Sequence, residues 1–337
     1  MAEGWRKFEK RQAVRAIDVA RVAGVSQSAV SRVFRGGSVA PQRRTEILRV
    51  AKALGYRPDA MARAIITRRS GIVGILMNSG TNLYYPDVLT ALCRAVSMQK
   101  LRAMVFAVES NADIDEAVEQ ALAYRVDGVV VLTDITVEHA EALSRLGSIL
   151  VHYNREIEGP SGNYVGCDHE RDGEMLGRHV AAKDATTFWI LEGPATSSLA
   201  ARRLAGLVRG LHSSPAQISV QHDTGDFSFK SGFNVIARRL AAGEDAPHAI
   251  IAVNDMMAIG AVEALRATGR PARSEILIAG FDGIAATNWP SFRITTMAQP
   301  LEQLAAAAIA IVVARLQDDS DSVERRTFSS RLDSRPT

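Results

Sequence analysis

Apolar runs alternate with helical stretches from Gly71 to near the end of this 337-residue chain, and this alternation limits the possible folds more than any other feature. The runs have the length and β-branched content of buried strands, as parallel βαβ units require. So many strands would be unusual in one open sheet, so two doubly wound sheets fit better. The expected strands are Ile72–Leu76, Ala103–Val108, Gly128–Leu132, Ser148–Tyr153, Thr187–Leu191, Ile218–Gln221, Ala249–Val253 and Ile276–Phe281. The expected helices are Pro86–Lys100, Ile114–Tyr124, Arg171–Ala182, Ala200–Leu211, Phe229–Ala241 and Asp255–Ala267.

A different pattern precedes Gly71. Within residues 16–35, Ile17 and Ala20 share a helical face, and Gly24 can supply the positive φ of a tight turn. Ser26 can then cap a second helix. The pattern predicts a helix-turn-helix, and the alternative is an ordinary pair of helices with a polar face.

The second of these helices carries the candidate DNA-binding side chains. Hydroxyl, amide and guanidinium groups at the start of such a helix suit the base edges displayed in a major groove. The candidates are Ser26, Gln27, Ser28, Ser31 and Arg32.

The charge of the chain is unevenly divided. Residues 1–70 contain sixteen Lys or Arg against five Asp or Glu, although the whole chain has a net charge of only +3. Concentrated positive charge on a short segment is typical of nucleic-acid binding, because neutralised phosphates release condensed counterions. We therefore expect double-stranded DNA to be a partner of this segment, and residues 1–15 to form a basic arm.

Other compositional features exclude several classes of protein. The N-terminus has no signal-peptide core and no run is long enough to cross a bilayer, so we expect a cytoplasmic protein without membrane contact. Cys93 and Cys167 are widely spaced, so we expect free thiols, no metal site and no cofactor. The signatures G-x-G-x-x-G, G-x-x-x-x-G-K-[ST], G-x-S-x-G and H-E-x-x-H do not occur, which argues against an α/β enzyme, the main alternative.

A third helix is expected at Pro41–Leu54, ended by Gly55, before Tyr56-Arg57-Pro58 and a short segment that begins Asp59-Ala-Met-Ala-Arg. This order is similar to the headpiece of the lactose-repressor (LacI/GalR) family of bacterial transcription regulators. The resemblance implies a helix-turn-helix headpiece over 16–58 and a hinge helix over 59–70 that folds on operator DNA. Ile65 stands where that family usually places a leucine that wedges into the minor groove.

The resemblance extends to near the C-terminus and implies the architecture of the remainder. The fold class is then an all-α headpiece with a hinge helix, followed by an α/β periplasmic-binding-protein-like core over 71–337. Two doubly wound lobes joined by three crossovers make up this core. The first lobe would take 71–183 and 299–322, including a helix at Leu301–Leu316. The second lobe would take 184–298 and 323–332, with a single last strand at Arg326–Leu332.

A ligand is expected beyond the carboxyl ends of the strands, as in open α/β sheets generally. The resemblance places the effector there, against a set of aromatic, carboxylate, amide and guanidinium side chains that suits a sugar, sugar acid or polyol. These candidates are Tyr84, Tyr85, Asp172, Arg203, Phe227, Asn254, Asp282 and Gln299. For Asp172 or Asn254 the alternative is a helix N-cap, and a shift of one position would exchange Arg203 for Arg202.

The function expected from these features is that of a homodimeric transcription regulator, most simply a repressor. Two headpieces would read the halves of a near-palindromic operator, and a small molecule bound between the lobes would control operator affinity. A nucleobase is the alternative to a sugar as the effector. An exported solute receptor would share the core, but the basic headpiece and the missing signal peptide argue against it.

Overall fold

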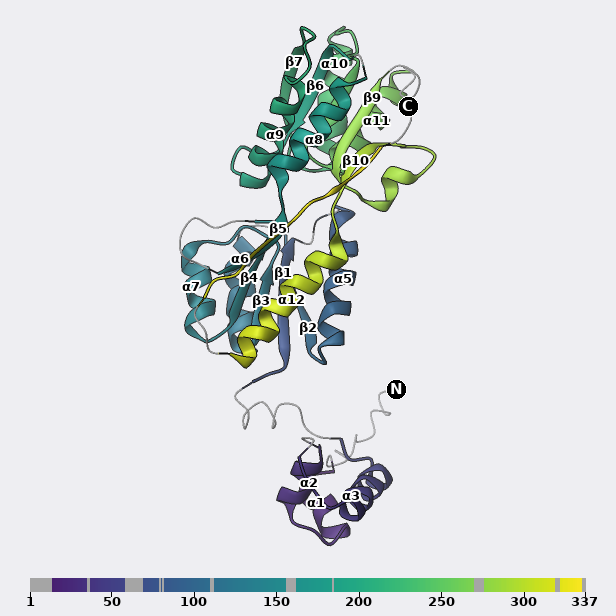
Figure 1. Ribbon diagram of the computed structural model, residues 1–337. Helices are drawn as coiled ribbons and strands as arrows, with labels where there is room; N and C mark the ends of the chain where they lie inside the picture. Colours follow the sequence, from purple (N-terminus) through teal and green to yellow (C-terminus); the bar gives the residue numbers. More distant parts are fainter. Residues whose placement is uncertain are drawn as a thin grey trace, which may run out of the picture. The chain divides into compact units, whose positions relative to one another are not determined.

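The computed structural model describes residues 14–34, 37–57, 69–78, 80, 82–109, 112–155, 162–183, 185–269, 276–318 and 322–334. The chain divides into two compact units, Met1–Ser70 and Gly71–Thr337. The first is a small helical headpiece and the second is an α/β core (Figure 1).

Three helices form the headpiece: α1 (Ala16–Val22), α2 (Gln27–Phe34) and α3 (Pro41–Leu54). Gly24 and Gly55 adopt φ of 61° and 66°, so the predicted helix-turn-helix and the predicted end of α3 are confirmed. The buried residues are Val19, Ala20, Val30, Val33, Ile47, Val50 and Ala51. Ile17 and Ala20 were expected to share a face, but Ile17 is 54% exposed and α1 buries Val19 and Ala20.

The first lobe of the core is a parallel six-stranded sheet in the order β11-β5-β4-β3-β1-β2. Its strands are β1 (Ile72–Asn78), β2 (Arg102–Val108), β3 (Gly128–Val131), β4 (Ile149–Tyr153), β5 (Asn163–Cys167) and β11 (Arg325–Phe328). Its helices are α5 (Tyr84–Met98), α6 (Ala112–Ala123), α7 (Val137–Arg145) and α12 (Leu301–Gln317). Every residue of β3 is buried, as expected for a central strand covered by helices on both faces.

The second lobe is a six-stranded sheet in the order β12-β10-β9-β8-β6-β7, in which only the pairing of β10 with β12 is antiparallel. Its strands are β6 (Thr187–Glu192), β7 (Ser219–Thr224), β8 (Ala249–Ala252), β9 (Leu277–Asp282), β10 (Thr295–Ala298) and β12 (Arg331–Asp333). Its helices are α8 (His169–Ala181), α9 (Ser198–Leu211), α10 (Phe229–Ala241), α11 (Asp255–Ala267) and the 3₁₀ helix η1 (Ala285–Asn288). The prediction of two doubly wound sheets is therefore confirmed.

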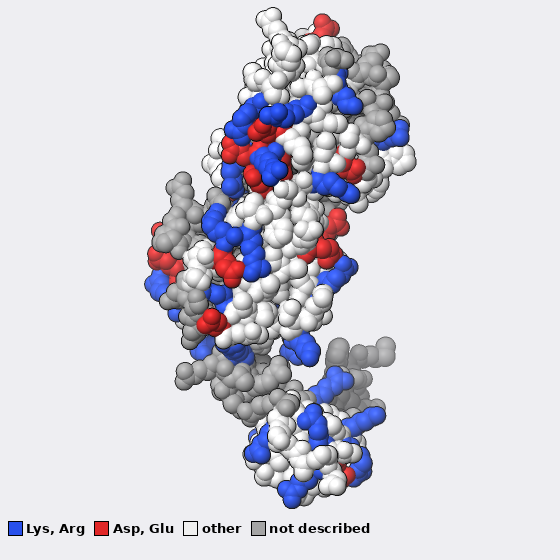
Figure 2. Space-filling view, viewed as in Figure 1, with Lys and Arg blue, Asp and Glu red and all other residues white. Residues whose placement is uncertain are grey.

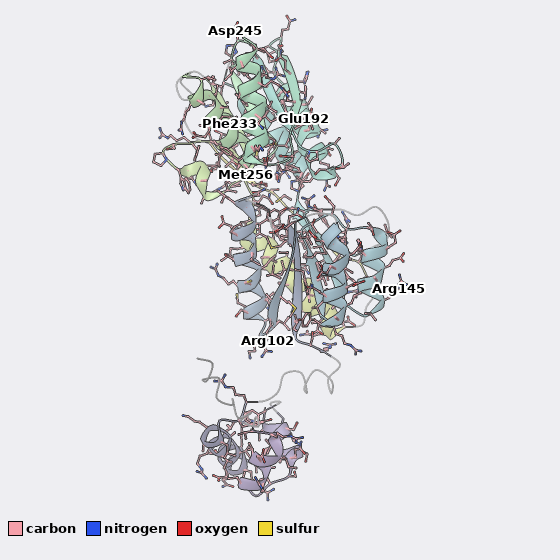
Figure 3. All side chains as sticks on the ribbon, turned by 180° about the vertical axis from the view of Figure 1, so that it is seen from behind. Arg102, Arg145, Glu192, Phe233, Asp245 and Met256 are labelled. Carbon is pink, nitrogen blue, oxygen red and sulfur yellow. The ribbon has the colours of Figure 1, made fainter. Side chains whose placement is uncertain are left out.

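The strands of both sheets direct their carboxyl ends toward the junction of the lobes. Met256, which follows β8, lies at the end of the second lobe nearest the first, whereas Arg102 at the start of β2 lies at the far end of the first lobe (Figure 3). Loops that follow the strands of both sheets therefore meet at the junction, where ligands bind in open α/β folds.

Four elements of the described core were not expected from the sequence: β5, β10, α7 and the 3₁₀ helix η1. β5 reads Asn-Tyr-Val-Gly-Cys and β10 reads Thr-Thr-Met-Ala, so neither carries a run of aliphatic residues. Both are nevertheless almost fully buried, because a parallel sheet with covered faces encloses every strand whatever its composition.

The first crossover lies earlier than predicted. α8 was expected in the first lobe, but it packs against α9 and closes the core of the second lobe. Glycines at matching positions on the two helices, Gly173 and Gly177 facing Gly206 and Gly210, let the backbones approach closely. The chain therefore leaves the first sheet at the end of β5 and enters the second lobe with α8.

The last strand was also predicted incorrectly. Residues 325–333 form two strands in different lobes: β11 pairs in parallel with β5, and β12 pairs antiparallel with β10. Between them Ser330 is held by Asp172 of α8, which accepts hydrogen bonds from its backbone N–H and its hydroxyl. The three crossovers thus run through residues 167–169, 298–301 and 328–331.

Candidate functional site

The headpiece presents one polar helix face. Gln27, Ser28 and Arg32 of α2 are exposed, and Ser31 is half-buried. Ser26 precedes the helix, and its hydroxyl accepts the Ala29 backbone N–H at 3.2 Å, so the expected cap is present. This face carries hydroxyl, amide and guanidinium groups on a short rigid helix, which is the chemistry needed to contact base edges.

The headpiece that carries this face has many exposed basic side chains. Lys and Arg outnumber Asp and Glu on the headpiece surface seen in Figure 2. Arg21, Arg43, Arg44, Arg49 and Lys52 are all exposed. The hinge segment predicted over 59–70, including Ile65, lies outside the described residues apart from its last two positions, and so does most of the N-terminal arm.

The core contains a cavity of about 260 Å³ at the junction of its two lobes. Residues at or beyond the carboxyl ends of β1, β3, β4, β6, β7, β8 and β9 contribute to its wall, together with the crossover residue Gln299. The lining residues are Asn78, Gly80, Asn82, Tyr84, Tyr85, Leu132, Tyr153, Asn154, Arg155, Leu199, Arg203, Asp226, Phe227, Ser228, Asn254, Asp282 and Gln299.

A buried ion pair forms the base of the cavity on the second lobe. The Arg203 guanidinium is 2% exposed and donates to Asp282 Oδ1 at 2.8 Å and to the Val253 carbonyl at 2.7 Å. The side chain also lies over the Phe281 ring, 5.0 Å from its centroid. Arg203, and not its neighbour Arg202, therefore lines the cavity, as the sequence indicated.

Gln299 joins this ion pair to the first lobe. Its Nε2 donates to Asp282 Oδ1 at 2.8 Å, while its Oε1 accepts from the Tyr84 hydroxyl at 2.9 Å and from Asn154 Nδ2 at 2.6 Å. Both polar atoms of the Gln299 amide are therefore hydrogen-bonded, Nε2 to the second lobe and Oε1 to the first. A continuous hydrogen-bonded chain runs from Asn154 and Tyr84 through Gln299 to Asp282 and Arg203.

Asn254 is at once a helix cap and a cavity residue. Its Oδ1 accepts the Met257 backbone N–H at 3.0 Å, and its Nδ2 donates to the Phe227 carbonyl at 2.8 Å. The N-cap alternative raised from the sequence is thus correct for this residue, yet it also lines the cavity. Capping fixes the amide and, through it, the backbone that carries the Phe227 ring.

Three cavity residues have unusual backbone conformations. Asn154, Phe227 and Asp282 adopt φ of 60°, 67° and 113°. Positive φ is uncommon for residues other than glycine, and such conformations concentrate at functional sites. The surrounding hydrogen bonds hold these side chains in place at a cost in backbone energy.

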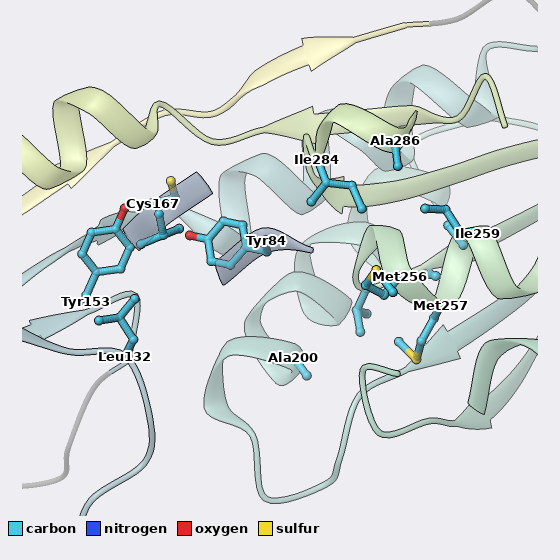
Figure 4. Close-up of a cluster of buried hydrophobic side chains, with 14 of the residues drawn as sticks. Tyr84, Leu132, Tyr153, Cys167, Ala200, Met256, Met257, Ile259, Ile284 and Ala286 are labelled. Atoms are coloured by element: carbon cyan, nitrogen blue, oxygen red, sulfur yellow. The ribbon is translucent and has the colours of Figure 1, made fainter. Parts of the chain in front are cut away.

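Burial governs the ionisation of the cavity groups. It raises the pKa of Asp282, against the opposing influence of the Arg203 charge. Burial also raises the pKa of the Tyr84 hydroxyl well above 10 and that of the Cys167 thiol to about 12. Tyr84, Tyr153 and Cys167 lie close together on the first-lobe side (Figure 4). The phenol and the thiol are therefore neutral groups at physiological pH.

One predicted contact residue lies elsewhere. Asp172 does not line the cavity: it is 1% exposed and accepts the Ser330 backbone N–H at 3.2 Å and the Ser330 hydroxyl at 2.5 Å. Because α8 begins beside the third crossover, its first turn faces that crossover and not the ligand cavity. The other predicted positions, Tyr84, Tyr85, Arg203, Phe227, Asn254, Asp282 and Gln299, all line it.

Several cavity residues were missed or given little weight from the sequence. Asn154 and Arg155 directly follow β4, and Asp226 follows β7, so their positions at strand ends were the available signal. The Arg155 guanidinium donates to the Leu132 carbonyl at 3.0 Å and to Asp134 at 2.8 Å. It therefore forms a second cationic wall, on the first lobe.

The structure contains no cluster of three His, Cys, Asp or Glu side chains able to hold a metal, as far as the described residues show. Within the same part of the chain, none of the helices combines the length and the apolar character that a membrane span requires.

Comparisons with known proteins agree with this architecture. Residues 73–320 match the periplasmic binding protein domain family, and residues 17–59 match the bacterial regulatory proteins of the lacI family. Catabolite control protein A of Staphylococcus epidermidis is 26% identical over 332 residues, covering 95% of this chain and 98% of that protein. The ribose operon repressor of Escherichia coli is 27% identical over 306 residues, covering 89% and 92%. A solved lac repressor dimer, bound to operator and the anti-inducer ONPF, superposes with a TM-score of 0.83 at 23% identity, covering 96% of this chain and 98% of that one.

Proposed function

Because this chain belongs to the lacI family of bacterial regulatory proteins, with a periplasmic binding protein domain as its core, we propose that it is a DNA-binding repressor controlled by a small molecule. The observation that carries the proposal is the cavity at the lobe junction, whose polar groups come from both lobes and meet at Gln299. A molecule bound there contacts both lobes at once. Its binding energy can therefore favour one arrangement of the lobes over another.

The DNA-binding role is assigned to α2. Ser26, Gln27, Ser28, Ser31 and Arg32 contact base edges, and the exposed basic side chains of the headpiece contact phosphates. Ile65 acts as the apolar wedge in the minor groove. Two copies of the chain bind the two halves of a near-palindromic operator in the cytoplasm, as expected for a dimer with two-fold symmetry.

A neutral polyhydroxylated molecule fits the cavity best. Asp282 and Asn254 supply acceptors for vicinal hydroxyls, Arg203 supplies donors, and Phe227 covers an apolar ring face. Each of the two guanidinium groups already has a carboxylate partner, Asp282 for Arg203 and Asp134 for Arg155. The volume of about 260 Å³ lies just below the range of about 300–1,000 Å³ for ligand pockets. A monosaccharide or a sugar alcohol is therefore favoured over a charged sugar acid.

Thermal denaturation of the full chain tests the ligand assignment. D-ribose, D-glucose, D-mannitol, D-gluconate, adenine and hypoxanthine are each added at millimolar concentration, and at least one neutral sugar or polyol should raise the Tm. Phe227→Ala should abolish that shift. Phe229→Ala is the matched control, because Phe229 lies two residues away on the surface and does not line the cavity. If only a nucleobase raises the Tm, the effector is a nucleobase and not a sugar. If none of the compounds raises the Tm, the result contradicts the ligand-controlled function.

The DNA assignment is tested by selection from a random duplex library. The wild-type chain should enrich a near-palindromic sequence. Arg32→Ala should bind that sequence less selectively, by about 1–3 kcal/mol of discrimination at the contacted base pair. Lys52→Ala removes one exposed charge from α3 and should weaken all sequences alike. Unchanged selectivity in Arg32→Ala would contradict the assignment of α2.

A further inference from the structure

A buried histidine lies directly behind the cavity arginine. His169 is the first residue of α8 and is 2% exposed, and it does not line the cavity. Its Nδ1 lies 3.4 Å from Arg203 Nε. Its Nε2 is buried and has no hydrogen-bond partner among the described residues. The imidazole ring therefore has one hydrogen-bond partner among the described residues, the Arg203 guanidinium.

The hydrogen bonds of Arg203 show what this contact contributes. Nη1 donates to the Val253 carbonyl and Nη2 donates to Asp282. These two hydrogen bonds fix the outer end of the guanidinium. The third group, Nε–H, points toward His169. Acceptance of the Nε–H adds a third hydrogen bond from a different element, so all three nitrogens of the guanidinium are held. The remaining N–H groups are then presented in a fixed direction.

This geometry requires one protonation state of the imidazole. An arginine Nε–H is only a donor, so Nδ1 of His169 must carry a lone pair and the ring proton must lie on Nε2. We propose that His169 is a positioning residue, an inference that rests on the proposed function. As the neutral Nε2–H tautomer, His169 accepts the Arg203 Nε–H and orients the guanidinium for a hydroxyl-bearing ligand.

The charges around His169 support the neutral form. Arg203 and Arg202 approach it from α9, and Arg155 approaches from the end of β4. On its own helix, Asp172 is bound to Ser330, and Asp282 of β9 is bound to Nη2 of Arg203. Burial and then the three guanidinium charges hold the pKa of His169 well below 6.5. The histidine is therefore an acceptor throughout the physiological pH range.

Close packing of α8 on α9 fixes the position of the His169 side chain relative to that of Arg203. A Cβ at Gly173 would collide with the Arg203 backbone carbonyl, so the helices are in direct backbone contact one turn from His169. The position of the imidazole relative to Arg203 is therefore set by helix packing and does not depend on the ligand.

The first test observes the tautomer without any ligand. The full chain is labelled with ¹⁵N-histidine, and ring resonances are assigned with His169→Asn. His169 should show the neutral Nε2–H pattern at pH 7.5 and keep it at pH 5.5, while the more exposed His179 of the same helix serves as the comparison. A protonated His169 ring, or the Nδ1–H tautomer, at pH 7.5 would overturn the proposal.

The second test separates positioning from packing. His169→Asn places an amide oxygen close to the former Nδ1, whereas His169→Leu fills the space and supplies no acceptor. With the sugar or polyol that gives the largest thermal shift, His169→Leu should bind at least about tenfold more weakly, as expected for a lost hydrogen bond to a charged group. His169→Asn should recover most of the affinity, and His179→Asn should bind like the wild type. Equal loss in His169→Leu and His169→Asn, with an unchanged Tm in both, would overturn the positioning role.

The two tests distinguish this proposal from the proposed function. If none of the tested compounds binds, the ligand assignment fails, while the tautomer measurement still decides whether His169 accepts from Arg203. If a compound binds but the three variants behave alike, the ligand assignment stands and the positioning role fails.

Discussion

At the scale of single residues, the cavity is organised by polar groups that satisfy one another. Asp282 was predictable because it follows a recognisable strand of a parallel sheet, where functional side chains collect, whereas Arg203 and Gln299 were expected from the resemblance to the lactose-repressor family. Asp172 was also expected from that resemblance and lies elsewhere, because α8 begins beside the third crossover and its first turn faces Ser330. Asn154 could not be given its proper weight, since its contact with Gln299 joins residues far apart in the sequence.

Removing one partner of the buried ion pair should be costly. Asp282→Ala leaves the Arg203 guanidinium buried without its carboxylate, and we expect a loss of about 3–5 kcal/mol in the free energy of unfolding. Asp282→Asn keeps an oxygen acceptor for Arg203, so its free energy of unfolding should fall by less. Urea denaturation at pH 7.5 measures both changes. A loss below about 1 kcal/mol in Asp282→Ala would show that the pair does not depend on its carboxylate.

The buried neutral His169 should make stability depend on pH. Its pKa is lowered in the folded chain, so below about pH 6.5 the unfolded chain takes up a proton that the folded chain does not. This contribution to stability is complete above pH 6.5 and declines as the pH falls, by at most about 1.4 kcal/mol per pH unit. His169→Asn lacks the titrating group. Between pH 7.5 and 5.5 the wild type should therefore lose more free energy of unfolding than His169→Asn, and parallel curves would contradict this prediction.

At the scale of elements, helices and strands were predicted best where the side chains are strongly apolar. α10 and α11 were predicted with their observed bounds, whereas β5 and β10 were missed because their burial comes from neighbouring helices and not from their own composition. The assignment of α8 to the first lobe was wrong for a related reason. Its glycines were visible in the sequence, but their partners on α9 were identified only when the two helices were seen to be in contact.

The contact between α8 and α9 should not tolerate added volume. Gly206→Ala raises intrinsic helix propensity by about 1 kcal/mol, but the new methyl would collide with the Glu170 backbone carbonyl. Since backbone cannot move aside as a side chain can, the collision should dominate and lower the free energy of unfolding by about 1–3 kcal/mol. The adjacent Ala205 is exposed, so Ala205→Gly provides a control that changes helix propensity alone. Thermal and urea denaturation compare the two variants, and a stabilised Gly206→Ala would show that the helices can separate.

At the scale of the whole molecule, the charge division and the two-lobed core were both accessible from the sequence. The charge of residues 1–70 follows directly from counting residues, and the number of alternating strands and helices favoured two sheets over one. The allocation of segments to lobes was less accessible. The last strand was read as a single element because Ser329 and Ser330, which divide it, give no strong signal for a crossover between lobes.

The division of charge predicts a steep dependence of DNA binding on salt. If the basic headpiece neutralises about six or more phosphates, raising the salt from about 50 to 200 mM should weaken operator binding about 10³-fold or more. Fluorescence anisotropy with a labelled duplex measures the slope, and sugar binding by the same protein, which involves no polyanion, should change little. A flat dependence would contradict the role of the headpiece charges.

The split of residues 325–333 between β11 and β12 also affects synthesis of the protein. Each of these short strands is an edge strand of a different sheet, so the first sheet is complete only when β11 has left the ribosome and the second only when β12 has followed it. Translation that stops after α12 produces a chain whose two lobes each lack an edge strand, and in which the Ser330 contact with Asp172 is missing. A truncated messenger RNA that ends at this point therefore yields a chain in which both lobes are incomplete.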